Sequence, residues 1–370
     1  MPIPLAYDRS YALNAICPYY TMFPLEYPLG ILRKHLHENP IVVDPFCGRG
    51  TTIYAARRTN LRSFGFDTSP IAVAIAQAKL ASSSKSDVLK LAKQLLKYPP
   101  RSTPTSKFFR HAFAPSTLRQ ICSLREGLLS INKDSNECVL LRAATLGCLH
   151  GPVAKNLELT GYFSNQMPRT FSSKPDYSVR YWQKWGMQAP EVNVLDVLER
   201  KLARIPELNQ RKIANFGRVK CADARLAQTY RNLHGRLVVI TSPPYYGMKT
   251  YLPDQWLRNW FLGGMEEVQY HGFTQLRHSS PEDFVRDLSR VWSHLKKRAD
   301  GIDLYVRLGT ISSVKSDAKT LFHESLEESR EWRIVYTKRA KTANAGKRQA
   351  QQMNGTSEAQ EELDFHAVAV

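Results

Sequence analysis

The sequence is short of paired cysteines, of long apolar runs and of acidic residues, and each shortage excludes a class of protein. Its six cysteines form no Cys-x-x-Cys pair and no cysteine–histidine cluster with zinc spacing, so we predict neither a disulfide scaffold nor a metal site. No run reaches the roughly 18 apolar residues of a membrane span. The opening residues lack the apolar core of a signal peptide because Asp8 and Arg9 interrupt it. We therefore expect a cytoplasmic protein that does not associate with membranes.

The shortage of acidic residues is the most informative of the three. Asp and Glu number 33 against 52 Lys and Arg, which gives a formal net charge of +19. An excess of this size indicates a polyanionic partner, most often a nucleic acid, although a solvated basic surface is the alternative. At 370 residues, 43% of them hydrophobic, the chain can bury a large core in one or two domains.

Strand-like apolar runs bounded by turn residues recur on both flanks of the chain. We predict strands at Ile41–Asp44, Ser63–Asp67, 219–223, 237–242, 303–308, 333–336 and 365–370. A helix is predicted to follow the second strand, with Pro70 in its first turn, where proline is tolerated. Strands that alternate with helices favour a mostly parallel, doubly wound α/β sheet.

The interval between Asp67 and Val219 breaks this alternation. It is far longer than one crossover helix, and a structureless loop of that length would be implausible in a compact domain. Helical patterns recur inside the interval at 87–96, 116–129 and 137–149. We therefore predict a mainly helical inserted domain at 83–215, and a main domain made of 1–82 and 216–370.

Two regions combine features of a nucleic-acid contact. The stretch 161–186 alternates basic side chains with the aromatic residues Tyr162, Phe163, Phe171, Tyr177, Tyr181, Trp182 and Trp185. Rings stack on bases and basic side chains pair with phosphates, so Arg169, Lys174 and Arg180 are candidate DNA-binding residues. An irregular subdomain with an aromatic core is the alternative. A second basic run, with Lys338 and Arg339, is predicted between the last two strands, as a phosphate contact or a solvated loop.

The segment 44–52 follows the first predicted strand and precedes a helical pattern. Its sequence is Asp-Pro-Phe-Cys-Gly-Arg-Gly-Thr-Thr. A strand, a glycine-bearing loop and a helix in this order are typical of the place where an α/β sheet binds a nucleotide-like ligand. Gly48 and Gly50 permit backbone angles and a close approach that a Cβ would prevent. Asp67 ends the next strand, where a carboxylate can accept both hydroxyls of a ribose.

This segment closely resembles the S-adenosylmethionine-binding motif of amino-group DNA methyltransferases, which usually have serine in place of Arg49. The segment 65–70 resembles their ribose-binding acidic motif, and 17–24 resembles the N-terminal motif beside the methionine part of the cofactor. The resemblance covers roughly 1–82 and 216–370. It implies a Rossmann-like methyltransferase fold, with a mostly parallel sheet and an antiparallel last strand.

The resemblance also implies a set of cofactor-binding residues. Asp223 would approach the adenine amino group of S-adenosylmethionine, and Asp67 would bind its ribose. The full set is Tyr20, Phe23, Asp44, Pro45, Phe46, Cys47, Gly48, Gly50, Thr51, Thr52, Asp67 and Asp223.

A second short motif, Ser242-Pro243-Pro244-Tyr245, follows another apolar strand. By itself it would be a surface turn, but it is similar to the catalytic [Asp/Asn/Ser]-Pro-Pro-[Tyr/Phe/Trp] motif of the same family. An exocyclic amino nitrogen is a poor nucleophile because its lone pair is delocalised into the ring. Two acceptors, Ser242 Oγ and the Pro243 carbonyl, would favour a localised lone pair, and Tyr245 would stack on the flipped base.

The resemblance implies a site-specific DNA methyltransferase that acts on the exocyclic amino group of a flipped base. Serine at the first catalytic position usually accompanies N4-cytosine methylation in this family, so we expect cytosine N4, with adenine N6 as the alternative. An RNA base methyltransferase and a non-catalytic nucleic-acid-binding module with a methyltransferase fold are the competing hypotheses. DNA is the expected partner, and a cognate restriction endonuclease would be a second one.

The aromatic residues after the catalytic turn have a simpler interpretation. Trp256 and Trp260 stand four positions apart, which predicts a helix face packed on the sheet rather than a platform for a base. Tyr246, Lys249 and Tyr251 follow the turn closely and are weaker candidates for the border of a base pocket.

Overall fold

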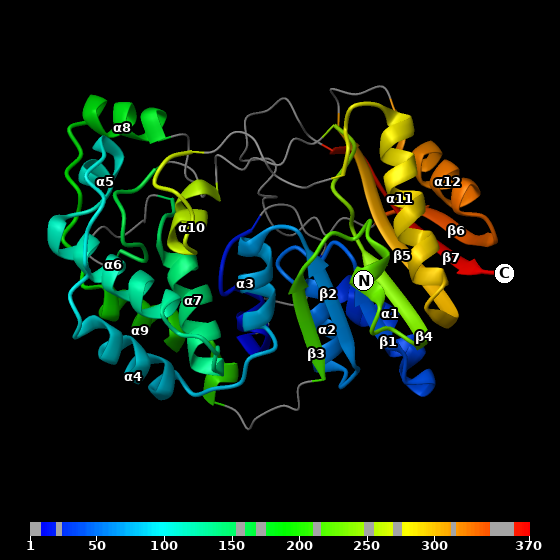
Figure 1. The fold of residues 1–370 in the computed structure, drawn as a ribbon, viewed down its shortest axis with the longest axis horizontal. Helices are drawn as coiled ribbons and strands as arrows, with labels where there is room; N and C mark the ends of the chain where they lie inside the picture. Colours follow the sequence, from blue (N-terminus) through cyan, green and yellow to red (C-terminus); the bar gives the residue numbers. More distant parts are fainter. Residues whose placement is uncertain are drawn as a thin grey trace, which may run out of the picture. The chain divides into compact units, whose positions relative to one another are not determined.

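The computed structural model describes residues 9–19, 24–152, 160–167, 175–209, 216–247, 255–268, 276–311, 316–340 and 359–370. The chain divides into two compact units, drawn in Figure 1. The sheet unit consists of Tyr19–Leu80, Ala214–Thr250 and Phe273–Val370, and the helical unit of Met1–Pro18, Ala81–Ile213 and Tyr251–Gly272. The helical unit thus contains most of the interval predicted as an insertion, together with 1–18 and 251–272, which the sequence analysis placed in the main domain.

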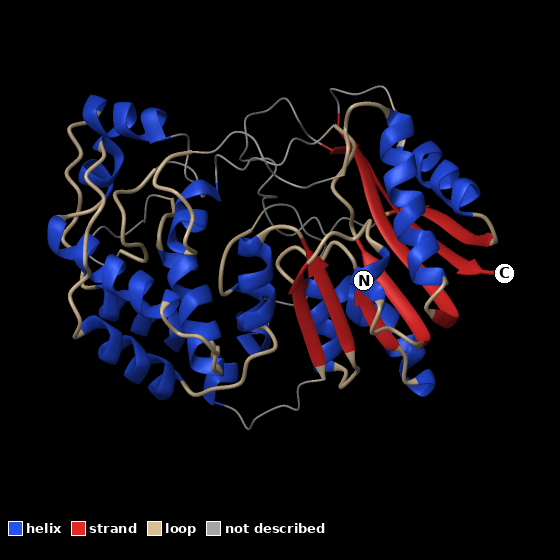
Figure 2. Cartoon of the chain, viewed as in Figure 1, coloured by secondary structure: helices blue, strands red, loops and turns tan. Residues whose placement is uncertain are grey.

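A seven-stranded sheet, shown in Figure 2, forms the core of the sheet unit in the order β3-β2-β1-β4-β5-β7-β6. Its strands are β1 (Ile41–Asp44), β2 (Ser63–Asp67), β3 (Gly217–Cys221), β4 (Gly235–Thr241), β5 (Ala299–Ile311), β6 (Trp332–Arg339) and β7 (Ala359–Ala369). Strands β1 to β5 pair in parallel, whereas β7 runs antiparallel to both β5 and β6. The prediction of a Rossmann-like methyltransferase fold with an antiparallel last strand is confirmed.

Strand β1 lies where the strand order reverses. The chain proceeds from β1 to β2 and β3 on one side, and then returns to β4 on the other side of β1. Val42 is consequently paired with Ser63 of β2 and with Val238 of β4, both in parallel register. The carboxyl ends of β1 and β4 are therefore neighbours, and α/β sheets bind their ligands outside such a reversal point.

The described helices of the sheet unit differ in whether a side chain caps their first turn. They are α1 (Glu26–His35), α2 (Thr51–Arg58), α3 (Pro70–Ala78), α11 (Pro281–Lys296) and α12 (Ala318–Ser329). The Ser69 hydroxyl accepts a hydrogen bond from the Ala72 amide at the start of α3, and Pro70 occupies the first helical position, as predicted. Ser280 caps α11 in the same way, and Pro281 follows it.

The helical unit contains the remaining described helices. They are α4 (Lys85–Leu96), α5 (Lys107–Ala112), α6 (Pro115–Leu129), α7 (Asn136–Cys148), α8 (Pro175–Lys184), α9 (Val194–Ala203) and α10 (Trp256–Phe261). The predictions at 87–96, 116–129 and 137–149 are confirmed as α4, α6 and α7. Within the described ranges, the helices are all too short or too polar to cross a membrane.

The tryptophans of α10 belong to the core of the helical unit. Trp256 and Trp260 are both buried, and their rings lie 4.7 Å from the rings of Phe108 and Phe109 respectively, measured between centroids. The prediction that they pack on the sheet was therefore wrong. Helical spacing shows that one face of a helix is buried, but it does not identify the element that covers this face.

Candidate active site

The loop after β1 has a backbone conformation that depends on glycine. Gly48 and Gly50 have φ angles of 49° and 79°, in the left-handed region that favours glycine. A Cβ on Gly50 would lie 2.7 Å from the Cβ and 2.9 Å from the Cα of Ala76 on α3. The loop is also tied to β2, because the Cys47 amide donates a 2.9 Å hydrogen bond to the Phe66 carbonyl. The backbone at Gly50 therefore lies closer to α3 than a residue with a Cβ would allow.

Asp67, at the end of β2, accepts two backbone hydrogen bonds from different loops. The Gly48 amide donates to Oδ2 across 2.9 Å, and the Ser69 amide donates to Oδ1 across 2.8 Å. Burial raises the pKa of Asp67, and these amide hydrogen bonds oppose that shift. Asp67 thus holds the glycine loop against the end of β2, and its side chain stays partly exposed.

Asp44, at the end of β1, joins the glycine loop to β4. Its Oδ1 accepts hydrogen bonds from Thr241 Oγ1 at 2.7 Å and from the Phe46 amide at 3.2 Å. Burial raises the pKa of Asp44 to about 7, although hydrogen bonds from Thr241 and Thr52 lower it. The Thr52 hydroxyl also donates to the Ile240 carbonyl of β4 at 3.1 Å. Two side chains therefore connect the loop of β1 to the strand that carries the second motif.

The catalytic-type turn begins directly after Thr241, so the structure brings the two sequence motifs together at neighbouring strand ends. Ser242 and Pro244 are partly exposed, whereas Pro243 is buried. Tyr245 is also buried, with 5% of its surface exposed, and it packs in the hydrophobic core of the sheet unit. Its hydroxyl donates a 3.0 Å hydrogen bond to Glu362 Oε1 of β7. Burial raises the pKa of Tyr245 far above its usual value, and the neighbouring Glu362 adds to this shift.

Asp223 lies just after β3, as Asp67 ends β2. Arg225 holds it through a backbone hydrogen bond of 2.9 Å to Oδ1 and side-chain hydrogen bonds of 3.0 Å to Oδ1 and 2.7 Å to Oδ2. Burial raises the pKa of Asp223, but the hydrogen bonds from Arg225 outweigh it and the net shift is downward. Asp67 and Asp223 thus lie at the carboxyl ends of paired strands, because β2 and β3 are parallel and Asp67 pairs with Cys221.

Two of these groups, Glu362 and Arg225, were not predicted from the sequence. Glu362 has no local signal, because it reaches Tyr245 only through the antiparallel pairing of β5 and β7. Arg225 does have a local signal. An aspartate whose carboxylate accepts a hydrogen bond from the amide two residues later forms a common turn. This turn places the side chain of the later residue beside the carboxylate.

The other predicted site residues have different outcomes. Tyr20, Phe23, Arg169 and Lys174 lie outside the described residues. Arg180 is exposed on α8. Lys338 and Arg339 are exposed at the end of β6, so their predicted place between the last two strands was wrong. Strand β6 lies at the edge of the sheet, and its side chains largely alternate between exposed and half-buried. It therefore continues beyond the apolar residues from which its end was predicted.

Two sequence comparisons match part of the chain. A family model described as DNA methylase (N6_N4_Mtase) matches residues 7–78. The type II methyltransferase M.MjaII of Methanocaldococcus jannaschii is 35% identical over 89 residues, which are 24% of this chain and 16% of that protein. The chain therefore matches only about a sixth of the length of this curated relative.

Two solved structures of the rRNA methyltransferase aviRa from Streptomyces viridochromogenes align over 98% of this chain at 12% identity. The alignments cover 94% and 93% of those two chains, with TM-scores of 0.37 and 0.34. Such low scores carry no argument about this protein. The match to the family model, by contrast, includes the glycine loop and β2, and together with the curated relative it confirms the predicted resemblance to the amino-group DNA methyltransferase family.

Proposed function

We propose that this protein transfers a methyl group from S-adenosylmethionine to the exocyclic amino group of a base in DNA. The observation that carries the proposal is the junction of the two motifs: Asp44 of the glycine loop is hydrogen-bonded to Thr241, which directly precedes Ser242. A cofactor held by the first motif would thus lie next to a base held by the second.

The residues of the glycine loop fit such a cofactor. No side chain caps the start of α2, which leaves its first amides available to a ligand. Thr51 Oγ1 is buried there without a hydrogen-bond partner in the described part of the chain. Asp67 would accept the ribose hydroxyls and Asp223 the adenine amino group. Bound S-adenosylmethionine would supply an electrophilic methyl group on a sulfonium.

The catalytic turn would prepare the base. Ser242 Oγ and the Pro243 carbonyl would accept hydrogen bonds from the amino group and localise its lone pair. Proline has no amide N–H and a restricted φ, which helps to hold the direction of this carbonyl. Tyr245 would stack on the flipped base. Because its ring is buried and its hydroxyl is bound to Glu362, stacking requires one face of the ring to become accessible.

The first residue of the turn supports cytosine N4 as the acceptor. Serine at this position usually accompanies N4-cytosine methylation in the family that the chain resembles, whereas aspartate or asparagine accompanies adenine N6. Adenine N6 in DNA is therefore the second candidate, followed by a base in RNA and by a non-catalytic nucleic-acid-binding module. A cognate restriction endonuclease would accompany the protein if it protects its host's DNA.

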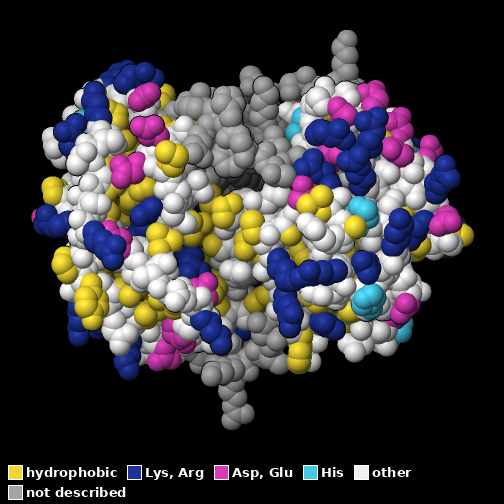
Figure 3. All heavy atoms as spheres, in the orientation of Figure 1, with side chains coloured by type: hydrophobic (Ala, Val, Ile, Leu, Met, Phe, Trp, Pro, Cys, Tyr) yellow, Lys and Arg dark blue, Asp and Glu magenta, His cyan; other side chains and the backbone are white. Residues whose placement is uncertain are grey.

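The charge distribution supports nucleic acid as the partner. The net charge is +19, and basic side chains are spread over both units on the face drawn in Figure 3. On α8, Val179 and Trp182 are buried, so these two residues of the stretch 161–186 pack in the core. The opposite side carries exposed Arg180 and Lys184, and Trp185, which directly follows α8, is 62% exposed. We infer that this side of α8 contributes to DNA binding.

The direct test is to express the protein in a host whose DNA lacks amino-methylated bases and to digest the genome to nucleosides. Mass spectrometry is expected to detect N4-methylcytosine. Detection of N6-methyladenine alone would overturn the cytosine assignment and keep the reaction class. If neither base appears, an assay with labelled cofactor and matched DNA and RNA would test the RNA hypothesis, which predicts methyl transfer to RNA alone. Cofactor binding without transfer to either nucleic acid would favour the non-catalytic module.

A further inference from the structure

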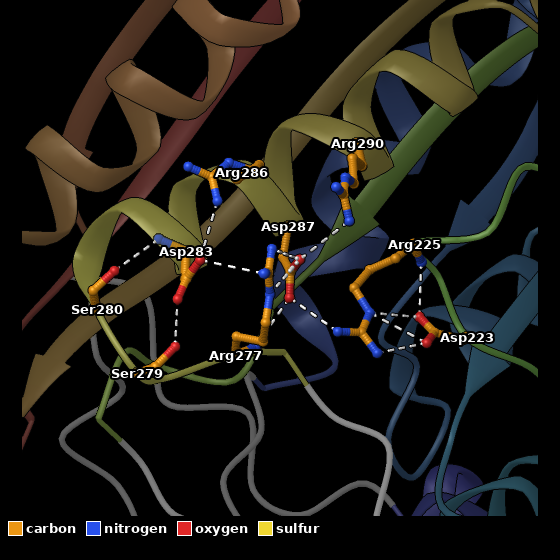
Figure 4. Close-up of polar contacts among 9 residues, drawn as sticks. All are labelled: Asp223, Arg225, Arg277, Ser279, Ser280, Asp283, Arg286, Asp287 and Arg290. Carbon is orange, nitrogen blue, oxygen red and sulfur yellow. Dashed lines mark hydrogen bonds and ion pairs between the residues drawn. The ribbon is translucent and has the colours of Figure 1, made fainter.

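A buried carboxylate on α11 organises the charged groups beside the candidate cofactor site. Asp287 has no exposed surface, and its carboxylate accepts hydrogen bonds from two arginines that come from different segments (Figure 4). Arg225 Nη1 donates to Oδ2 across 3.0 Å, and Arg277 Nη2 donates to Oδ1 across 2.8 Å. The Arg277 amide and Nε donate to it as well, at 3.0 and 3.1 Å. A buried carboxylate with this many charged donors is well compensated.

Arg225 bridges this carboxylate to Asp223. Its Nη1 binds Asp287 while its Nε and Nη2 bind Asp223, so opposite edges of one planar guanidinium serve two acids (Figure 4). A lysine could not reproduce this arrangement, because it offers a single nitrogen. Asp287 therefore determines where the Arg225 guanidinium lies, and Arg225 determines where the Asp223 carboxylate lies.

The contacts leave Asp223 able to accept a further hydrogen bond. Its Oδ1 takes the Arg225 amide and Nε, whereas Oδ2 takes Nη2 at 2.7 Å and a longer contact from Nε at 3.2 Å. The single Nε hydrogen is shared between the two oxygens, so three N–H groups of Arg225 occupy all but one of the roughly four acceptor positions of the carboxylate and leave room for one further donor. Because Arg225 also keeps the group ionised, Asp223 remains an oriented acceptor that suits a ligand N–H and disfavours a ligand carbonyl.

The other arginine leads to the catalytic turn. Arg277 is followed by His278, whose Nδ1 accepts a 3.1 Å hydrogen bond from the Gly247 amide, two residues after Tyr245. The His278 ring lies 6.0 Å from the Tyr246 ring and 5.6 Å from the Phe284 ring of α11, measured between centroids. Asp287 thus holds the segment that supports the backbone just beyond the catalytic turn.

We propose that Asp287 is a shared positioning residue: through Arg225 it orients the acceptor that selects the 6-amino group of the cofactor, and through Arg277 it supports Gly247, at the start of the loop after the catalytic turn. The inference rests on the proposed function, because it takes Asp223 as the adenine contact. It adds Arg225, Arg277 and Asp287 to the residues that the family resemblance supplies.

The cofactor arm is tested by binding, without turnover. Calorimetry would compare S-adenosylhomocysteine with S-inosylhomocysteine, in which a carbonyl replaces the 6-amino group. The wild-type protein is expected to prefer the adenosyl compound, and Arg225→Gln to lose about 10-fold or more of that preference, since an oriented charged acceptor is removed. Arg286→Gln is the matched control, because Arg286 is exposed on the same helix as Asp287 and binds only Asp283 among the residues drawn in Figure 4.

The loop arm is tested by the balance between affinity and turnover. Arg277→Gln is expected to lower kcat about 10-fold while the affinity for S-adenosylhomocysteine stays unchanged, because it disturbs only one of the two arms. Asp287→Asn is expected to show both defects. Circular dichroism and thermal unfolding would identify a variant that fails to fold. If Asp287→Asn fails to fold, the two arginine variants still test both arms of the proposal.

The outcomes separate the inference from the proposed function. A wild-type protein that binds neither homocysteine compound would contradict the proposed function itself. A wild-type protein that prefers the adenosyl compound, with that preference intact in folded Arg225→Gln, would overturn the cofactor arm. Unchanged kcat in folded Arg277→Gln would overturn the loop arm.

Discussion

The Thr241 hydroxyl donates a 2.7 Å hydrogen bond to Asp44 Oδ1, and this bond joins residues that are 197 positions apart in the sequence. It connects the glycine loop after β1 to the strand that leads into the Ser-Pro-Pro-Tyr turn. The two residues are neighbours because β1 and β4 are adjacent parallel strands whose carboxyl ends lie at the same edge of the sheet.

Gly50→Ala is expected to destabilise the protein by about 1–3 kcal/mol and to weaken cofactor binding, because the new Cβ would collide with Ala76 and the residue has a positive φ. Gly30→Ala is the matched control, since Gly30 lies within α1 and a Cβ there meets nothing within 4 Å. It is expected to stabilise by about 0.5–1 kcal/mol. Urea unfolding measures both variants, and equal effects would contradict the proposed role of Gly50.

Asp44 is expected to make the stability of the sheet unit depend on pH. Burial raises its pKa from 3.8 to about 7, so the folded protein binds a proton more tightly than the unfolded chain does. The stability of the folded state should therefore fall as pH rises from about 4 to about 7, by on the order of 2–4 kcal/mol from this residue, and change little above that.

Asp44→Asn provides the check on this pH dependence. An asparagine oxygen can still accept the hydrogen bonds from Thr241 and the Phe46 amide, but it does not titrate. Urea unfolding of the wild type and the variant at pH 5 and pH 7.5 should show a smaller difference between the two pH values in the variant. Parallel pH profiles would show that Asp44 does not titrate in this range.

Ser242→Ala is expected to lose about 100-fold or more in turnover, because one of the two acceptors for the amino group is removed. Its affinity for S-adenosylhomocysteine should remain that of the wild type, since the cofactor residues are untouched. Single-turnover methylation and calorimetry on the same preparation measure the two quantities. Near-normal turnover would exclude the role proposed for this hydroxyl.

Tyr245→Phe is expected to retain most of the turnover, because the ring that would stack on the base is preserved. The loss of the hydrogen bond to Glu362 should destabilise the protein by about 1 kcal/mol. Glu362→Gln keeps an acceptor for the same hydroxyl and should have a smaller effect. A Phe variant as inactive as Tyr245→Ala would show that the hydroxyl, and not the ring, is the important group.

Replacing Arg169, Lys174 and Arg180 together with glutamine is expected to weaken DNA binding on all sequences. The slope of log affinity against log salt should become shallower by about 1 for each phosphate that the variant no longer neutralises. The matched control replaces Lys90, Lys93 and Lys97, whose side chains are exposed on or next to α4 and carry the same total charge. Equal reductions in affinity for both triple variants would indicate that only net charge matters.

The sequence predicted every strand of the sheet within a few residues at one or both ends. The central strands β1, β2 and β4 could be found because the apolar runs of parallel strands are buried on both faces. Residues 237–240 of β4, for example, have no exposed surface. Helices α5, α8 and α9 of the helical unit were not predicted, and neither were α1, α11 and α12 of the sheet unit. Helix α5 has only six residues, and α8 lies in the stretch 161–186, whose aromatic and basic side chains were interpreted as a nucleic-acid contact or an irregular subdomain.

The glycine loop and the Ser-Pro-Pro-Tyr turn were found from local residues and from the resemblance of these motifs to those of a known family, because a tight backbone approach and a fixed carbonyl require particular residue types at fixed spacings. Partners that depend on distant segments could not be found in this way. Glu362 meets Tyr245 through the pairing of β7, and Asp287 meets Arg225 through the packing of α11. Local chemistry is thus determined by the sequence itself, whereas the choice of buried ionic and hydrogen-bond partners is made only when the sheet brings remote strands together and excludes water from between them.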